Sequence, residues 1–167
     1  PDGNTISATE HSIAMILAMA RNIPQAHQSL KAGEWNRKAF RGTELYKKTL
    51  GIIGAGRIGL GVAKRAQSFG MQILAFDPYL TEDKAKSLDI QLATVDEIAS
   101  KSDFVTVHTP LTPKTKGIVG ENFFKKAKPN LQIINVARGG IIDEDALINA
   151  LDHAQISRAA IDVFKHE

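Results

Sequence analysis

The 167-residue sequence contains no cysteine, which excludes disulfide bonds and metal sites built from thiolates. This absence fits a reducing compartment, so we expect a cytoplasmic location. The longest apolar run, from Ile13 to Ala20, is far shorter than the roughly 20 residues that a membrane-spanning helix needs. No secretory signal pattern is visible near the amino end. Neither a disulfide-stapled protein nor a membrane protein is expected.

Charge of one sign is also scarce. The 21 basic residues are interspersed with 18 acidic ones and leave a net charge of +3. The densest basic run, Lys125, Lys126 and Lys128, lacks interleaved aromatic residues and is expected to be a solvated helix end. We therefore expect no nucleic-acid partner and a small anionic substrate instead. The histidines form no cluster with metal-ligand spacing, so no metal site is expected.

A glycine-rich turn is the most informative feature that is present. The apolar run from Leu50 to Ile53 predicts a buried strand, and Gly54 would make the tight turn after it. Gly56 would let the main chain approach a pyrophosphate, and Gly59 would let the next helix, 57–68, pack closely. The free N–H groups at the start of that helix favour an anion. The pattern indicates a dinucleotide-binding site.

An acidic residue follows the next predicted strand. The strand spans 72–76, and Asp77 comes 18 positions after Gly59, close to the spacing of about 20 for the acid that binds the adenosine ribose. A carboxylate there would repel a 2′-phosphate, which predicts NAD rather than NADP. The alternative interpretation is that Asp77 only starts an Asp-Pro turn.

The remaining sequence alternates short apolar strands with helices. This predicts an α/β fold, a Rossmann-type doubly wound parallel sheet with helices on both faces. The expected strands are 103–107, 132–136 and 157–163, with a weaker one near 90–92, and the expected helices are 94–100, 121–127 and 143–151. We expect residues 1–167 to form one NAD-binding domain. Its core would span 46–167, and its amino-terminal helical segment would span 1–45.

The amino-terminal segment predicts a helix from about Asn4 to Ala32, kinked or broken at Pro24. Ser7 and Glu10 have the spacing of a capping box. Between residues 13 and 20 almost no polar face remains, and such a helix must be covered on several sides. Three sources of cover are open: the sheet of the same chain, a domain outside this sequence, and a second copy of the chain. We expect a second copy, in a symmetric homodimer.

Five segments together resemble the D-isomer-specific 2-hydroxyacid dehydrogenases, and the resemblance covers nearly all of the sequence. The segments are 54–59, 77–78, 107–110 (V-H-T-P), 135–140 (N-V-A-R-G-G) and 160–164 (A-I-D-V-F). The resemblance implies hydride transfer between NAD and the C2 carbon of a hydroxy acid. The stretches 3–10 and 35–45 are most similar to members that oxidise 3-phospho-D-glycerate.

The resemblance implies two catalytic residues in this chain. Arg138 matches the Arg that binds the substrate carboxylate, for which a permanently charged, bidentate guanidinium is suited. Glu167 matches the Glu that hydrogen-bonds the catalytic His and keeps its pKa high enough for acid-base work. That His lies in a later H-x-G motif, and no residue follows Glu167, so we expect this chain to bind NAD but to turn over little substrate. His108 matches a position near the nicotinamide where packing or hydrogen bonding is expected rather than proton transfer.

Matching positions also imply the cofactor contacts. The expected set is Gly54, Gly56, Arg57, Ile58, Gly59, Asp77, Thr109, Val136, Ala137, Arg138 and Asp162. Two alternatives stay open for the function. The first is another 2-hydroxyacid dehydrogenase, such as a glyoxylate or hydroxypyruvate reductase. The second is a non-catalytic, NAD-sensing scaffold similar to the C-terminal-binding-protein corepressors.

Overall fold

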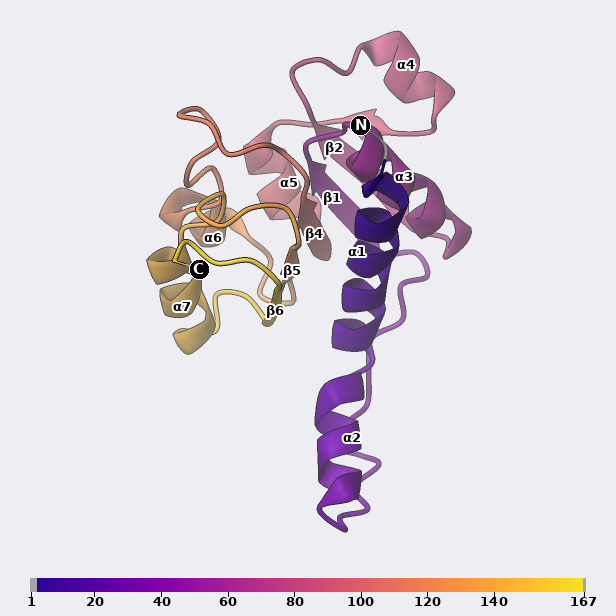
Figure 1. Cartoon of the computed structure of the whole chain (residues 1–167), viewed down its shortest axis with the longest axis vertical. Coiled ribbons are helices and arrows are strands. Elements are labelled where there is room, and N and C mark those ends of the chain that lie inside the picture. Colours follow the sequence, from indigo (N-terminus) through magenta and orange to yellow (C-terminus); the bar gives the residue numbers. More distant parts are fainter. Residues whose placement is uncertain (1–2, 167) are drawn as a thin grey trace.

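The computed structural model describes residues 3–166 and is built around one six-stranded sheet (Figure 1). All neighbouring strands pair in parallel, in the order β3-β2-β1-β4-β5-β6. The strands are β1 (Thr49–Ile53), β2 (Gln72–Phe76), β3 (Gln91–Leu92), β4 (Phe104–Val107), β5 (Gln132–Asn135) and β6 (Arg158–Ile161). The strand order reverses between β1 and β4, which places a ligand crevice at their carboxyl ends. The predicted fold class is confirmed.

Helices cover both faces of the sheet. They are α1 (Thr5–Ala20), α2 (Ile23–Lys31), α3 (Arg57–Ser68), α4 (Glu82–Ser87), α5 (Val95–Lys101), α6 (Glu121–Lys126) and α7 (Glu144–Asp152). One hydrophobic cluster joins the sheet to α1 and α3, and a second joins it to α5, α6 and α7. Neighbouring strand residues supply opposite clusters, as Ile52 and Ile53 do, because successive side chains point to opposite faces. The sheet is therefore buried on both sides.

The amino-terminal helix breaks where Pro24 predicts. Asn22 adopts a left-handed conformation (φ 55°) between α1 and α2, and Pro24 lies in the first turn of α2. Arg158 of β6 fastens this break, because its guanidinium donates to the Met19 carbonyl (2.9 Å) and to the Asn22 side chain. The predicted capping box is wrong. Helix α1 starts earlier than that box requires, after Asn4, and no side chain caps it.

Helix α1 packs closely on α3 through small residues and buried hydroxyls. Thr9 donates to the Thr5 carbonyl and Ser12 to the Ala8 carbonyl, both at 2.7 Å, so neither buried hydroxyl is left unpaired. A methyl group added at Gly61 would lie 2.9 Å from the Thr9 hydroxyl oxygen. Close approach at this point fixes α1 against the body of the domain.

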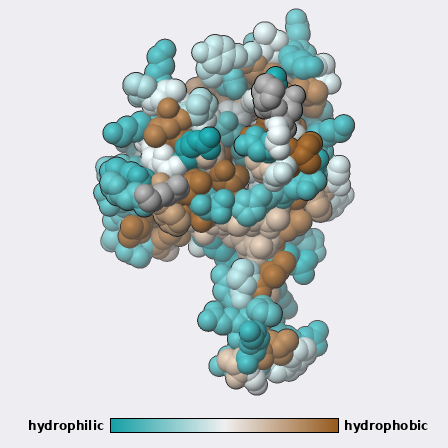
Figure 2. All heavy atoms as spheres, in the orientation of Figure 1, coloured by the Kyte–Doolittle hydropathy of each residue, from teal (hydrophilic) through white to brown (hydrophobic). Residues whose placement is uncertain are grey.

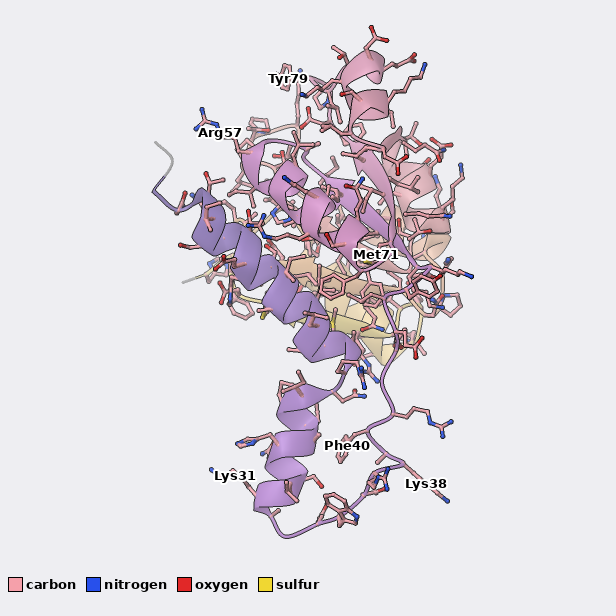
Figure 3. The ribbon with its side chains drawn as sticks, turned by 90° about the vertical axis from the view of Figure 1, so that its right-hand side faces the viewer. Lys31, Lys38, Phe40, Arg57, Met71 and Tyr79 are labelled. Carbon is pink, nitrogen blue, oxygen red and sulfur yellow. The ribbon has the colours of Figure 1, made fainter. Side chains whose placement is uncertain are left out.

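Residues 21–44 project from the body, and we call them the projection (Figures 1 and 3). Helix α2 has no buried residue, and Ile23, Leu30 and Trp35 expose 55%, 57% and 76% of their surface. Figure 2 shows hydrophobic atoms among the hydrophilic ones on this part. The hydrophobic core of this chain does not hold the projection in place.

Three further features differ from, or add to, the prediction. Helix α4 was not predicted, although Thr81 caps it by accepting from the Lys84 N–H. Strand β6 is shorter than the predicted 157–163 because the chain leaves the sheet after Ile161. Among residues 3–166, no helix is long and apolar enough to cross a membrane.

Candidate cofactor cleft

The glycine turn has the geometry that the sequence predicts. Gly54 follows β1 with φ +97°, and a side chain there would lie 2.7 Å from the backbone at His108. A methyl group at Gly59 would overlap the Gly54 carbonyl oxygen. At Gly56, by contrast, a methyl group would meet no atom within 4 Å. The turn is closed toward the protein at two glycines and open at Gly56, where a pyrophosphate would need to approach.

Asp77 lies at the end of β2 and holds the turn. One carboxylate oxygen accepts from the Ala55 N–H (2.7 Å) and the other from the Tyr79 N–H (2.8 Å). These bonds use part of its acceptor capacity, because each ionised carboxylate oxygen offers about two lone pairs. The carboxylate therefore fixes the turn and still offers acceptor sites at the cleft.

Two hollows flank the turn at the carboxyl edge of the sheet. The first encloses about 450 Å³ and the second about 200 Å³, and both contain His108 and Thr109. Of the predicted cofactor residues, Gly54, Gly56, Asp77 and Thr109 line the larger hollow. Ile58, Thr109, Val136, Ala137 and Arg138 line the smaller one. The structure thus gathers most of the predicted set on one edge of the sheet, around two neighbouring hollows.

The loop that carries Arg138 is held by a buried asparagine. Asn135, the last residue of β5, donates from Nδ2 to the Arg138 carbonyl (3.0 Å) and accepts from the Ala137 N–H (3.0 Å). The Arg138 guanidinium is exposed and donates to the Ala137 carbonyl (2.6 Å). Asn135 stands in the N-V-A-R-G-G segment but was not predicted to hold the loop, although a polar residue directly after a buried apolar strand is a usable signal.

The segment after β6 crosses directly over this loop. A methyl group at Gly139 would overlap the carbonyl of Phe164, so the two backbones are in contact. Lys165 donates its N–H to a Glu144 carboxylate oxygen (2.6 Å), which ties the segment to α7. Glu167 lies outside the described residues. The chain nevertheless brings the residues leading to it against the Arg138 loop.

Asp162 has a partner that the sequence did not suggest. Its Oδ2 lies 3.2 Å from Nε2 of His11 in α1. Ala8, one turn before His11, lines the smaller hollow together with Asn4. Asp162 itself lines neither hollow, and neither do Arg57 and Gly59. Helix α1 is therefore part of the nicotinamide side of the predicted site.

His108 is partly buried between the two hollows and lines both of them. Its Nε2 lies 2.9 Å from the hydroxyl of Thr106, which is fully buried in β4. Burial disfavours the charged ring and lowers the pKa of His108 to about 4. The ring is neutral at pH 7 and suited to hydrogen bonding, as the sequence analysis expects.

The lysines of the densest basic run are paired with carboxylates. Lys125 contacts Glu121 (2.7 Å), Lys126 contacts Asp96 (2.5 Å) and Lys128 contacts Asp103 (2.8 Å). The absence of a nucleic-acid partner stays a prediction. In the described part of the chain, no three His, Asp or Glu side chains are grouped to hold a metal ion.

Comparisons with known proteins agree with this geometry. Residues 13–167 match the family model "D-isomer specific 2-hydroxyacid dehydrogenase, NAD binding domain". The D-3-phosphoglycerate dehydrogenase of Bacillus subtilis is 52% identical over 167 residues, which are all of this chain and 32% of that protein. The chain thus spans about a third of that relative's length.

Solved structures match as well. The apo-structure of D-lactate dehydrogenase from Escherichia coli has a TM-score of 0.92 at 33% identity, covering 98% of this chain and 52% of that one. The Aquifex aeolicus D-lactate dehydrogenase complexed with NAD and lactic acid has a TM-score of 0.91 at 32% identity, covering 97% and 49%.

Proposed function

Because the chain belongs to the NAD-binding domain family of the D-isomer-specific 2-hydroxyacid dehydrogenases, we propose that it is the cofactor-binding part of an enzyme. This enzyme would oxidise 3-phospho-D-glycerate. The product would be 3-phosphooxypyruvate, and the reaction would be the first step of serine biosynthesis. The 52% identity with the Bacillus subtilis enzyme supports this substrate. Since the chain spans 32% of that relative, the reaction is proposed for the protein as a whole.

The residues at the cleft fit a dinucleotide. The open face of Gly56, beside the Asp77 carboxylate and the first N–H groups of α3, is the observation that carries the proposal. Asp77 would accept from the adenosine ribose hydroxyls, and Thr109, Val136 and Ala137 would surround the nicotinamide side.

When bound, NAD would supply the hydride acceptor. Oxidation of the substrate would break its C2–H bond, with the electron pair passing as hydride to NAD. The hydroxyl proton would pass to the acid-base His that the family resemblance places in a later H-x-G motif, so that the C2 carbonyl forms. Arg138 would hold the substrate carboxylate and so orient C2, supported by the Asn135 hydrogen bonds to its loop. His108, with its pKa lowered to about 4, stays neutral and adds no positive charge beside an oxidised nicotinamide.

Calorimetry of this chain with NADH and, separately, NADPH tests the cofactor assignment. We expect tighter binding of NADH, because the Asp77 carboxylate repels a 2′-phosphate. Asp77→Asn should narrow the difference in affinity between NADH and NADPH. The amide keeps an acceptor for the Ala55 N–H but loses the negative charge. Equal affinity of the unaltered chain for both would reject the assignment.

Asp162→Ala should weaken NADH binding while the fold stays intact, because the carboxylate is half exposed and pairs only with an exposed His11 among the residues described. His11→Gln is the matched control for loss of this contact alone. Unchanged affinity in Asp162→Ala would count against a cofactor role.

A substrate panel tests the substrate. The whole protein would be assayed with 3-phospho-D-glycerate, and with hydroxypyruvate, glyoxylate and pyruvate in the reverse direction. Preference for pyruvate would favour the D-lactate dehydrogenases, which the fold also resembles. No turnover with any of them would favour a sensing scaffold.

We also propose a homodimer. Ile13 and Leu17 of α1 and Phe69 line an apolar hollow of about 440 Å³ on the surface, and the projection exposes Leu30 and Trp35. A second copy would cover these surfaces. Light scattering at tens of micromolar should give twice the 18.1 kDa chain mass. The cytoplasmic location, suggested by the missing cysteines, stays a prediction.

A further inference from the structure

The segment after the last strand lies outside the hydrophobic core. Strand β6 ends at Ile161, and residues 162–166, which we call the crossing segment, contain no buried residue. Phe164, its largest apolar side chain, is 53% exposed. Figure 1 shows this segment returning from β6 toward α7. Because the core contributes little to holding it, its position depends on polar and backbone contacts.

Contacts at three points along the crossing segment hold it on the body. At its start, the Asp162 N–H donates to the Asn135 carbonyl (3.0 Å). In its middle, its backbone lies so close to Gly139 that a methyl group there would overlap it. Near its end, the Lys165 N–H donates to Oε1 of Glu144 (2.6 Å). The first two contacts are made by backbone, whereas the third depends on a side chain that a single substitution can remove.

Glu144 stands at a well-anchored helix start. It is the first residue of α7, and the preceding Asp143 caps the helix by accepting from the Ala146 N–H (3.1 Å). Asp143 also donates its own N–H to the Val119 carbonyl (2.9 Å), and Leu147 in the first turn of the helix is buried. The Glu144 carboxylate therefore fastens a segment outside the core to a fixed point of the body.

A neighbouring acidic residue shows what the helix start alone requires. Acidic side chains in the first turn of a helix interact favourably with the helix dipole, and both Glu144 and Asp145 stand there. Glu144 is partly buried and bonds a residue 21 positions later. The Asp145 side chain is exposed and forms no hydrogen bond or ion pair within residues 3–166. The two carboxylates therefore share the dipole interaction, and only Glu144 reaches the crossing segment.

We propose that Glu144 is a positioning residue for the reaction, an inference that rests on the function proposed above. The crossing segment lies on the Arg138 loop and leads to Glu167, which matches the Glu that orients the acid-base His. By holding Lys165, Glu144 sets where the chain carries Glu167 relative to Arg138. Catalytic groups must be held within about 0.5 Å of the productive geometry, so release of this bond should slow the chemical step.

Steady-state kinetics of the whole protein with 3-phospho-D-glycerate and NAD test the proposal. Glu144→Ala removes the acceptor and should lower kcat roughly tenfold. The KM for NAD should change less than about twofold, because Glu144 and Lys165 line neither hollow of the cofactor cleft. Glu144→Gln keeps an oxygen that accepts from the Lys165 N–H and should restore most of kcat. Asp145→Ala removes the same charge from the same turn and should leave both constants unchanged.

Hydrogen exchange of the whole protein separates positioning from a loss of stability. In Glu144→Ala, the peptide that contains residues 162–166 should exchange faster, while amides of β1 keep their rates. Glu144→Asp is a second variant, because it keeps the charge at the helix start and shortens the reach to Lys165. It should also lower kcat and speed exchange of the crossing segment. Glu144→Gln and Asp145→Ala should exchange like the unaltered protein.

Several outcomes would overturn the positioning role while leaving the proposed function in place. These are an unchanged kcat in Glu144→Ala, an equal loss of kcat in Asp145→Ala, and a loss in Glu144→Gln as large as that in Glu144→Ala. Unchanged exchange of the crossing segment in Glu144→Ala would do the same. No turnover by the unaltered protein with any substrate of the panel would instead reject the proposed function, and the positioning role with it.

Discussion

The carboxyl edge of the sheet and the projection are held by different means. At the edge, the glycine turn contacts the backbone at His108, Asp77 bonds the turn, and Asn135 bonds the Arg138 loop. In the projection, α2 buries no side chain, and residues 32–44 reach the body chiefly through Gly42 and Thr43. The edge is shaped by contacts within the chain, whereas the projection presents its side chains outward. Substitutions at the edge should therefore change folding, and substitutions on the projection should change association.

The largest expected effect comes from closing the turn. Gly59→Ala would place a methyl group on the Gly54 carbonyl and should destabilise the fold by about 3 kcal/mol. Urea unfolding followed by circular dichroism measures this loss. An unaltered midpoint would mean that α3 can shift without penalty, and the packing argument would be wrong.

A pH effect of similar size is expected from His108. The unfolded ring takes up a proton below about pH 6.5, whereas the folded ring does so only near the lowered pKa of about 4. Stability is therefore fully present above pH 6.5 and falls by up to roughly 3 kcal/mol as the pH drops toward 4.

The comparison uses two histidine variants. His108→Gln should flatten the dependence of unfolding free energy on pH across this window. His27→Gln, on the exposed face of α2, should leave it unchanged. If both variants behave alike, the acid sensitivity does not come from the cleft.

Gly56→Ala separates binding from folding at the same turn. Its backbone angles (φ −73°, ψ −163°) suit alanine and no atom opposes a methyl group, so the unfolding free energy should change by less than about 0.5 kcal/mol. NADH affinity should fall at least about tenfold, because the methyl group would fill the pyrophosphate approach. Calorimetry that finds undiminished affinity would show that the cofactor does not approach there.

The smallest effect on stability is expected in the projection. Trp35→Ala removes a ring that is 76% exposed and should change the unfolding free energy by less than about 0.5 kcal/mol. The dimer fraction in light scattering should fall. Tyr79→Ala removes a ring that is 91% exposed at the cleft and should leave the mass unchanged. A mass insensitive to Trp35 would remove this residue from the proposed interface.

The sequence predicted the parts of the fold in which local pattern and packing agree. Helix α3 has the predicted bounds, and β1 and β2 lie at the predicted positions, because buried parallel strands are continuous apolar runs. Helix α4 was not predicted because its six mostly charged residues carry no periodic apolar stripe. Only the Thr81 cap marks its start.

At the site, residues carried by strand ends could be predicted and tertiary partners could not. Gly54, Asp77 and Thr109 follow predicted strands and meet at one edge. The contact of His11 with Asp162 joins positions 151 residues apart, and nothing local in either segment signals the other.

Helix α1 connects the cofactor cleft to the projection. Asn4, which precedes the helix, lines the smaller hollow of the cleft, Arg21 follows the helix at the start of the projection, and the 16-residue helix between them is about 24 Å long. Arg158 of β6 donates a hydrogen bond to the Met19 carbonyl near the end of the helix, and β6 leads to Asp162. A partner bound to the projection would therefore contact one end of a helix whose other end lines the cleft, so assembly and the shape of the cofactor cleft depend on the same helix.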